Sequence, residues 1–358
     1  MLIPSRREIV EEVKSRGQRI AAVLPIHYPR PLLRAAGFHP IEVWGPPHVD
    51  PTIGNAHFQA YTCAIVRHAA SFLVSEAATV ADLILVPHTC DSLQGLGSVL
   101  IDFIAPRQPV LTLYHARGRR ECDVEFTIAE LKRLASALVE AGGEAVDEET
   151  LTRELEVEGR LLQTMRGLAL HRDDFAICDR DFYTLLRSWE FLPPERFCAL
   201  AEQIPRGTPP GERPIRLMIS GIVPEPLEIF DRLNDVGARI VADDLACLSR
   251  RLYKTADVDY DPWRRLALMM LGMPPEPTVG SPIPQRIDHL LRRLDESRAQ
   301  GLLVYDVKFC EPELFDLPLV KQALGERGFS VLHLEVELGL ATANQTLTRI
   351  EAFVETLQ

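Results

Sequence analysis

One pattern occurs twice in this chain: a buried strand, a cysteine close behind it, and then a helix. The apolar run 83–86 (LILV) is followed by Cys90, and the largely apolar strand 301–309 is followed at once by Cys310. Runs this short and apolar are typical of parallel strands that are buried on both faces. Ligands of open α/β sheets bind just beyond the carboxyl ends of the strands. The pattern therefore predicts an α/β fold and places both cysteines where binding and catalysis occur.

Strand-like and helix-like segments alternate in both halves of the sequence. Strands are predicted at 20–24, 40–44, 81–86, 110–114, 215–219, 238–242, 302–307 and 331–334. Helices are predicted around them, among them 9–13, 58–74, 92–104, 126–141, 226–236, 261–271, 284–297, 312–324 and 345–357. Such alternation implies parallel sheets with helices on both faces, so we expect two α/β lobes of similar plan.

The middle of the chain differs from both halves because it has helical spacing and no clear strand. Helices are predicted at 148–170, 179–187 and 195–204, and the Pro- and Gly-rich segment 205–211 (PRGTPPG) is the best linker candidate. We therefore divide the chain into an N-terminal α/β lobe at 1–145, a helical bridge and linker at 146–210, and a C-terminal α/β lobe at 211–358.

Composition and charge exclude several classes of protein. No run of the 358 residues approaches the roughly 20 apolar residues that cross a bilayer. Residues 1–19 are charged and lack the apolar core of a signal peptide, so we expect a cytoplasmic protein without a membrane partner. The net charge of −12, without a basic stripe, argues against a nucleic-acid partner. Seven cysteines in a long cytoplasmic chain are not the framework of a disulfide-rich protein.

The cysteines allow two interpretations. Cys90, Cys247 and Cys310 lie near strand ends, and Cys63 lies on the helix predicted before the strand of Cys90. A lone cysteine is usually a small buried hydrophobe, and this structural interpretation suits the remaining three. A thiolate at a helix N-terminus is stabilised by the helix dipole, and thiolates from two lobes bind zinc or an iron–sulfur cluster. No CxxC pair is present, which argues against a zinc ribbon and a ferredoxin-type cluster.

Polar residues at other strand ends are candidates for acid–base or binding groups. His27, His88 and His115 each follow an apolar strand, so they could line a cleft as acids or bases. A structural histidine explains each of them equally well. The backbone N–H groups of Ser220-Gly221 could bind a carbonyl or a phosphate, although a tight turn also explains this pair.

Five segments spaced along the chain resemble the motifs of one family. They are HFQAYTCAIVR at 57–67, VPHTCDS at 86–92, ADDLACLSR at 242–250, FCE at 309–311 and TRIEAF at 348–353. In this order they resemble the 2-hydroxyacyl-CoA dehydratase / benzoyl-CoA reductase subunit family, in its 2-hydroxyglutaryl-CoA dehydratase D-component form. The resemblance runs from about Gly17 to the C-terminus.

The resemblance implies a fold, a cofactor and partners. It implies two Rossmann-like (flavodoxin-like) parallel-sheet lobes joined by a helical segment, with a [4Fe-4S] cluster between the lobes. Three cysteines hold the cluster and leave one iron open. Such subunits pair with a paralogous subunit or with a second copy of themselves. An ATP-hydrolysing iron–sulfur activator protein supplies a low-potential electron, which passes to the thioester of an acyl-CoA substrate.

Carried over motif by motif, the resemblance assigns the metal to Cys63, Cys90 and Cys310. Cys247 also matches a family cysteine and is a further cofactor-binding candidate. We predict His27, His88 and Ser220 as catalytic groups of the cleft. The loop 273–284 has no cysteine where many relatives carry one, which argues against a larger double-cubane cluster. The segment 344–349 also lacks the Gly-Gln that precedes Thr-Arg in many relatives.

The predicted function is that of a cluster-bearing subunit of an ATP-driven, radical-type 2-hydroxyacyl-CoA dehydratase or aromatic or enoyl acyl-CoA reductase. Three alternatives stay open. The chain could be a non-catalytic electron-relay or structural partner subunit, a double-cubane cluster reductase, or an α/β binding protein without a metal.

Overall fold

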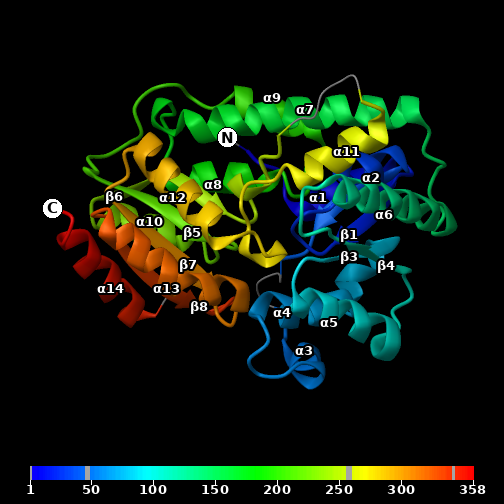
Figure 1. The fold of residues 1–358 in the computed structure, drawn as a ribbon, viewed down its shortest axis with the longest axis horizontal. Coiled ribbons are helices and arrows are strands. Elements are labelled where there is room, and N and C mark those ends of the chain that lie inside the picture. Colours follow the sequence, from blue (N-terminus) through cyan, green and yellow to red (C-terminus); the bar gives the residue numbers. More distant parts are fainter. Residues whose placement is uncertain (1, 45–48, 255–259, 341–342) are drawn as a thin grey trace.

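Two parallel sheets of four strands each form the framework of the molecule. The structure is a computed structural model that describes residues 2–44, 49–254, 260–340 and 343–358. The strand orders are β2-β1-β3-β4 and β6-β5-β7-β8, so the two halves of the chain have the same topology (Figure 1). Every neighbouring pair of strands is parallel. The predicted α/β class with two parallel-sheet lobes is confirmed.

All eight predicted strands are present, with ends that differ by a few residues. The first sheet contains β1 (Arg19–Val23), β2 (Phe38–Glu42), β3 (Leu83–His88) and β4 (Val110–Tyr114). The second contains β5 (Ile215–Gly221), β6 (Ala238–Leu245), β7 (Gly301–Val307) and β8 (Ser330–Val336). Every residue of β7 and all but the last of β3 are buried, which explains their apolar sequences.

The helices of the first half confirm most of the predicted segments. They are α1 (Arg6–Ser15), α2 (Arg30–Ala35), α3 (Thr52–His57), α4 (Ala64–Leu73), α5 (Asp91–Val99) and α6 (Glu121–Glu140), with short turns η1 (Glu76–Val80) and η2 (Leu100–Ile104). The single helix predicted at 58–74 is wrong at its start, because the backbone of Phe58 is extended and α4 begins at Ala64. Gly54 explains the break: a Cβ there would lie 1.9 Å from the carbonyl oxygen of Arg67, so α3 packs backbone to backbone on α4.

The middle and the second half are also close to the predicted pattern. The middle contains α7 (Glu148–Leu170), η3 (Arg172–Asp174), α8 (Asp179–Ser188) and α9 (Pro194–Glu202). The second half contains α10 (Glu228–Asp235), η4 (Ser249–Arg251), α11 (Pro262–Leu271), η5 (Pro277–Val279), α12 (Ile283–Ser297), α13 (Glu311–Glu326) and α14 (Asn344–Glu355). In Figure 1, α7 and α9 run along one side of the molecule, past both sheets.

Contacts between the two halves are extensive. Helix α11 of the second half packs on α6 of the first half and on α7 of the middle. One hydrophobic cluster contains buried residues from both sheets, for example Val23 of β1 and Tyr305 of β7. The predicted boundaries at 145 and 210 stay a prediction. Among the described residues, no helix has the length and apolar character needed to span a membrane.

Candidate metal centre

Cys63, Cys90 and Cys310 share one structural position: each is the N-cap residue of a helix. They precede α4, α5 and α13. The first two helices belong to the first half of the chain and the third to the second half. The three side chains line one small cavity of about 40 Å³. The predicted ligand set is therefore brought together at the meeting point of the two halves.

The remaining walls of this cavity, which we call the cysteine cavity, are mostly apolar. Pro25, Ile26 and Trp44 line it from the first half, and Ile222 and Phe309 line it from the second. Cys63 and Cys310 are buried, and Cys90 is partly buried. The site is therefore shielded from water.

Backbone strain is concentrated around the cysteine cavity. In the described part of the chain, five non-glycine residues have a left-handed backbone, and Ile26, His27 and Phe309 are three of them. A left-handed isoleucine or phenylalanine is a genuine conformational outlier. Ile26 and Phe309 line the cavity, and His27 is next to Ile26. Strain of this kind persists where the surrounding structure holds it, and it clusters at functional sites.

Two opposing effects act on the thiols. Backbone N–H groups at the starts of α4 and α5 lower the pKa of Cys63 and Cys90, which favours the thiolate. Burial outweighs this effect: it raises the pKa of Cys63, raises that of Cys90 to about 12, and raises that of Cys310 well above its usual value. Cys63 also raises the pKa of Cys90 and of Cys310, which reflects how close the sulfurs are.

These properties suit a metal cluster that supplies positive charge. Three thiolates in one buried cavity repel each other. Ligation displaces the thiol protons, and the positive charge of the bound metal ions offsets the repulsion between the thiolates. Among the described residues, no group of three Cys, His, Asp or Glu side chains converges on a single metal-ion position. The thiolates of an iron–sulfur cluster bind different irons, so they need not converge on one point. Three thiols that line one cavity are a donor set that different irons of one cluster can use.

Cys247 does not line the cysteine cavity, but its backbone N–H donates at 3.0 Å to the carbonyl oxygen of Ile222, which does. It is fully buried, and burial raises the pKa of its thiol well above the usual value. Arg187 opposes this increase, whereas Glu190 adds to it. The indole Nε1 of Trp189 donates to the carbonyl oxygen of Cys247 at 3.1 Å. Its cofactor-binding role stays a prediction.

His27, His88 and His115 lie at the carboxyl ends of three neighbouring strands of the first sheet. His27 and His115 follow β1 and β4, and His88 is the last residue of β3. The Nδ1 atom of His27 lies 2.8 Å from the Tyr253 hydroxyl, and its ring centroid is 6.2 Å from that of His115. Burial lowers the pKa of all three imidazoles. Nε2 of His27, Nε2 of His115 and both ring nitrogens of His88 are buried and have no hydrogen-bond partner within the described ranges of the chain. The catalytic roles of His27 and His88 are not tested by this geometry and stay predictions.

Comparison with known proteins assigns the chain to a family over almost its whole length. Residues 25–357 match the family model described as 2-hydroxyglutaryl-CoA dehydratase, D-component. The chain belongs to this family. The resemblance found in the sequence motifs is thereby confirmed.

Relatives within the D-component family are named as subunits of acyl-CoA enzymes. The chain is 23% identical to the (R)-phenyllactyl-CoA dehydratase beta subunit of Clostridium sporogenes, over 98% of this chain and 95% of the relative. It is 24% identical to the (R)-2-hydroxyglutaryl-CoA dehydratase subunit beta of Acidaminococcus fermentans, over 99% and 96%. It is 24% identical to one subunit of the benzoyl-CoA reductase of Thauera aromatica, over 86% and 83%. The chain is thus related over its length to components of multi-subunit enzymes.

Ser220 of this D-component chain lies inside a buried charge network. Its Oγ donates to Asp244 Oδ2 at 2.8 Å and accepts from Arg250 Nη2 at 3.1 Å and Arg286 Nη2 at 3.2 Å. Burial would raise the pKa of Asp244, but the two arginines hold it well below its usual range. Ser220 is also paired with strands on both sides within β5. Its contacts are those of a structural residue, and its catalytic role stays a prediction.

Two residues near the cysteine cavity were missed by sequence reasoning. Trp44 lines the cavity and donates from Nε1 to Glu42 Oε2 at 2.8 Å. Asp306 of β7 is buried, which raises its pKa to about 6, and its charge raises the pKa of Cys63 and Cys310. A carboxylate in the middle of an otherwise apolar strand was the available signal for Asp306. Trp44 carried no such signal.

Proposed function

We propose that this chain is a [4Fe-4S] cluster-bearing subunit of an ATP-driven 2-hydroxyacyl-CoA dehydratase or acyl-CoA reductase. The observation that supports this most directly is the set of three helix-capping cysteines, drawn from both halves, around one buried cavity. Family membership supports the acyl-CoA enzyme class. The cluster, the radical-type reaction and the ATP-driven electron supply are part of the proposal.

The roles of individual residues follow from their positions. Cys63, Cys90 and Cys310 would hold the cluster, whose chemistry is one-electron transfer to a CoA thioester carbonyl. The N–H groups at the starts of α4 and α5 would stabilise the thiolate charge that ligation creates. Ile26, Trp44 and Phe309 would keep water away from this charge, which strengthens electrostatic interactions inside the cavity. His27, His88 and Ser220 remain candidates for moving or holding protons.

Partner proteins are also part of the proposal. The relatives are named as beta subunits of dehydratases or as one subunit of a reductase, so we propose a paralogous subunit, or a second copy of this chain, as the permanent partner. A separate ATP-hydrolysing iron–sulfur activator would deliver the electron. The cytoplasmic location predicted from the sequence stays a prediction.

Iron and acid-labile sulfide per chain test the cluster directly, after strictly anaerobic purification. We expect about four irons per chain and a broad absorption band. Cys90→Ser should lose most of the iron, whereas Cys122→Ser should keep it, because Cys122 is exposed on α6 and does not line the cysteine cavity. Well-folded, colourless wild-type protein without iron would overturn the proposal. About eight irons would favour the double-cubane alternative.

A non-catalytic relay subunit is the second candidate, because the relatives are named as single subunits of larger enzymes. Turnover of acyl-CoA by the iron-loaded chain with an activator, but without a paralogous subunit, distinguishes the two. Consumption of substrate under these conditions would exclude the relay function. Iron-loaded protein that is inactive alone and gains activity on addition of the paralogue would show that turnover needs the paralogue, as catalytic subunit or as permanent partner.

A further inference from the structure

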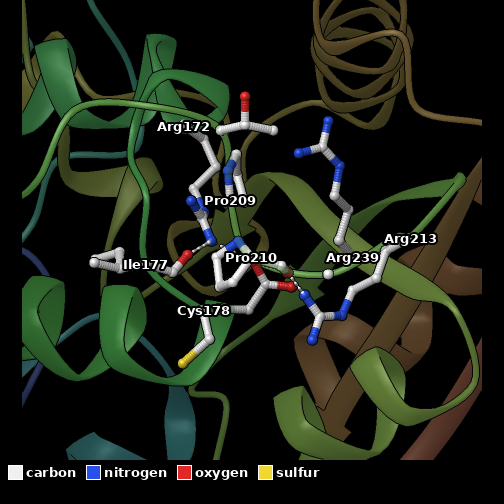
Figure 2. A pocket seen from close by; sticks show the side chains of 10 residues that line it. Arg172, Ile177, Cys178, Pro209, Pro210, Arg213 and Arg239 are labelled. Carbon is white, nitrogen blue, oxygen red and sulfur yellow. Dashed lines mark hydrogen bonds and ion pairs between the residues drawn. The ribbon is translucent and has the colours of Figure 1, made fainter.

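A second cavity, lined by arginines, lies away from the cysteine cavity and has a different chemical character. We call it the arginine pocket: about 180 Å³, lined by Arg172, Ile177, Cys178, Asp179, Thr208, Pro209, Pro210, Gly211, Arg213 and Arg239. Figure 2 shows the three arginine side chains around the Pro209–Pro210 turn, with Cys178 below them. None of these residues lines the cysteine cavity.

Positive charge around the arginine pocket exceeds the negative charge that faces it. Asp173 forms ion pairs with two arginines. Its Oδ1 lies 2.9 Å from Arg239 Nη2, and its Oδ2 lies 2.8 Å from Arg216 Nη1. Arg213 donates to the carbonyl oxygens of Pro210 and Asn234 and, within the described residues, has no carboxylate at ion-pair distance. Such a surplus is notable in a chain whose net charge is −12.

Asp179 provides the second carboxylate. It pairs with Arg172 at 2.7 Å and also accepts from Asn234 Nδ2 and from the backbone N–H of Ile240. Its oxygens are therefore engaged. Three arginines share the two aspartates, and Arg213 pairs with neither. This surplus is consistent with the lowered pKa of Arg239, to which burial and the charges of Arg216 and Arg172 contribute.

One residue that lines the pocket has an unsatisfied donor. Arg172 is 4% exposed, and its Nε has no hydrogen-bond partner among the described residues, although the other two nitrogens of its guanidinium donate to carbonyls and to Asp179. A buried donor without a partner costs about 1–3 kcal/mol, so native structures usually supply an acceptor. Helix α8 also begins at the pocket, because Cys178 is its N-cap residue, and a helix N-terminus favours negative charge.

We propose that the arginine pocket binds a phosphate group, either as inorganic phosphate or as a phosphomonoester. A phosphate dianion offers several acceptor oxygens to guanidinium groups, which bind it through parallel, charge-assisted hydrogen bonds. A cavity of about 180 Å³ admits a phosphate with its hydration water. Two ligands carry a phosphate group that such a pocket would bind: free phosphate, and coenzyme A through its ribose phosphate.

Calorimetric titration of the full chain with inorganic phosphate, at fixed ionic strength, tests the pocket. We expect one phosphate to bind per chain. Its affinity should fall by about tenfold or more after Arg213→Gln or Arg239→Gln. We leave Arg172 unchanged because it is buried and donates to the carbonyl oxygens of Phe175 and Ile177 in its own loop. Arg232→Gln is the matched control, since Arg232 is exposed on α10 and does not line the pocket. Thermal unfolding of each variant confirms that it is folded.

Titrations with coenzyme A and dephospho-coenzyme A distinguish the two sources. Binding of coenzyme A that weakens without the ribose phosphate, and weakens again in Arg239→Gln, identifies the cofactor as the source. Binding of inorganic phosphate alone identifies free phosphate. Absence of phosphate binding to wild-type protein, or equal affinity in wild type and both pocket variants, would overturn the proposal. None of these results depends on iron content, so they are independent of the proposed cluster.

Discussion

The protonation of one residue, His115, should change the free energy of unfolding of the whole chain. Burial, and then the charge of His88, lowers its pKa from 6.5 to about 4. The unfolded chain therefore binds a proton between pH 6.5 and 4 that the folded chain does not. Stability from this site is present above about pH 6.5 and is lost as the pH falls toward 4, by at most about 3 kcal/mol.

His115→Gln removes this titration. The free energy of unfolding of the variant should therefore fall less than that of wild type as the pH is lowered. Urea unfolding at pH 7, 6 and 5 measures the difference. The control is His171→Gln, because the side chain of His171 is 60% exposed and lies away from His115 and His88. Parallel pH profiles for wild type and His115→Gln would show that His115 titrates normally.

Helix α5 packs closely on strand β3, and Gly97 is where this packing is tightest. A Cβ at Gly97 would lie 2.8 Å from Nε2 of His88. The His88 ring cannot easily move away, because it stands edge-on to Tyr114 with the ring centroids 4.7 Å apart. Gly97→Ala should therefore lower the free energy of unfolding by roughly 1–3 kcal/mol, as overpacking does.

Gly95 offers a control within the same helix, since nothing lies within 4 Å of a Cβ placed there. Gly95→Ala should be neutral or stabilise the protein by up to about 1 kcal/mol through helix propensity. Urea unfolding of both variants checks the pair. Equal effects of the two substitutions would mean that helix propensity, rather than contact with His88, decides the outcome.

Element types were predictable from the sequence because buried parallel strands and amphipathic helices leave strong periodic patterns. Helix α7 begins and ends at the predicted residues, 148 and 170. The start of α4 was not predictable, since the cause is a backbone contact between Gly54 and Arg67 that no periodicity reports. For the same reason Cys63 was placed inside a helix, whereas it stands at the N-cap.

The candidate metal centre was predictable only in part. Position after a strand identified Cys90 and Cys310, but Cys63 was selected through the family resemblance. The sequence alone ranked Cys247 above Cys63, because Cys247 lies near a strand end. The contribution of Trp44 depends on how the two halves meet, which is a tertiary property without a local sequence signal.

At the scale of the whole molecule, one buried ion pair joins the two halves. Arg251 donates from Nη1 and Nη2 to Glu42 Oε2 and Oε1, at 2.8 and 2.6 Å, across 209 positions of sequence. Burial would raise the pKa of Glu42, but Arg251 outweighs it and holds that pKa below its usual range. Trp189 covers the guanidinium of Arg251, whose central carbon lies 4.7 Å from the ring centroid.

Arg251→Met should cost about 3–5 kcal/mol, because it leaves the Glu42 carboxylate buried without its countercharge. Urea unfolding at pH 7 measures the loss. The double variant Glu42→Gln, Arg251→Met should recover part of it, since no charge is then left unpaired. A double variant as unstable as the sum of the two single variants would show that the pair acts through packing and not through charge.

The three helix-capping cysteines of the cysteine cavity also bear on how this lineage can diverge. Serine and aspartate cap helices better than a thiol does, so either can replace Cys63, Cys90 or Cys310 while keeping the helix start intact. A descendant could therefore lose the proposed cluster through single substitutions and keep the architecture unchanged. Among distant relatives, overall similarity of sequence and fold would then predict metal content poorly. The residues at these three helix starts would predict it better.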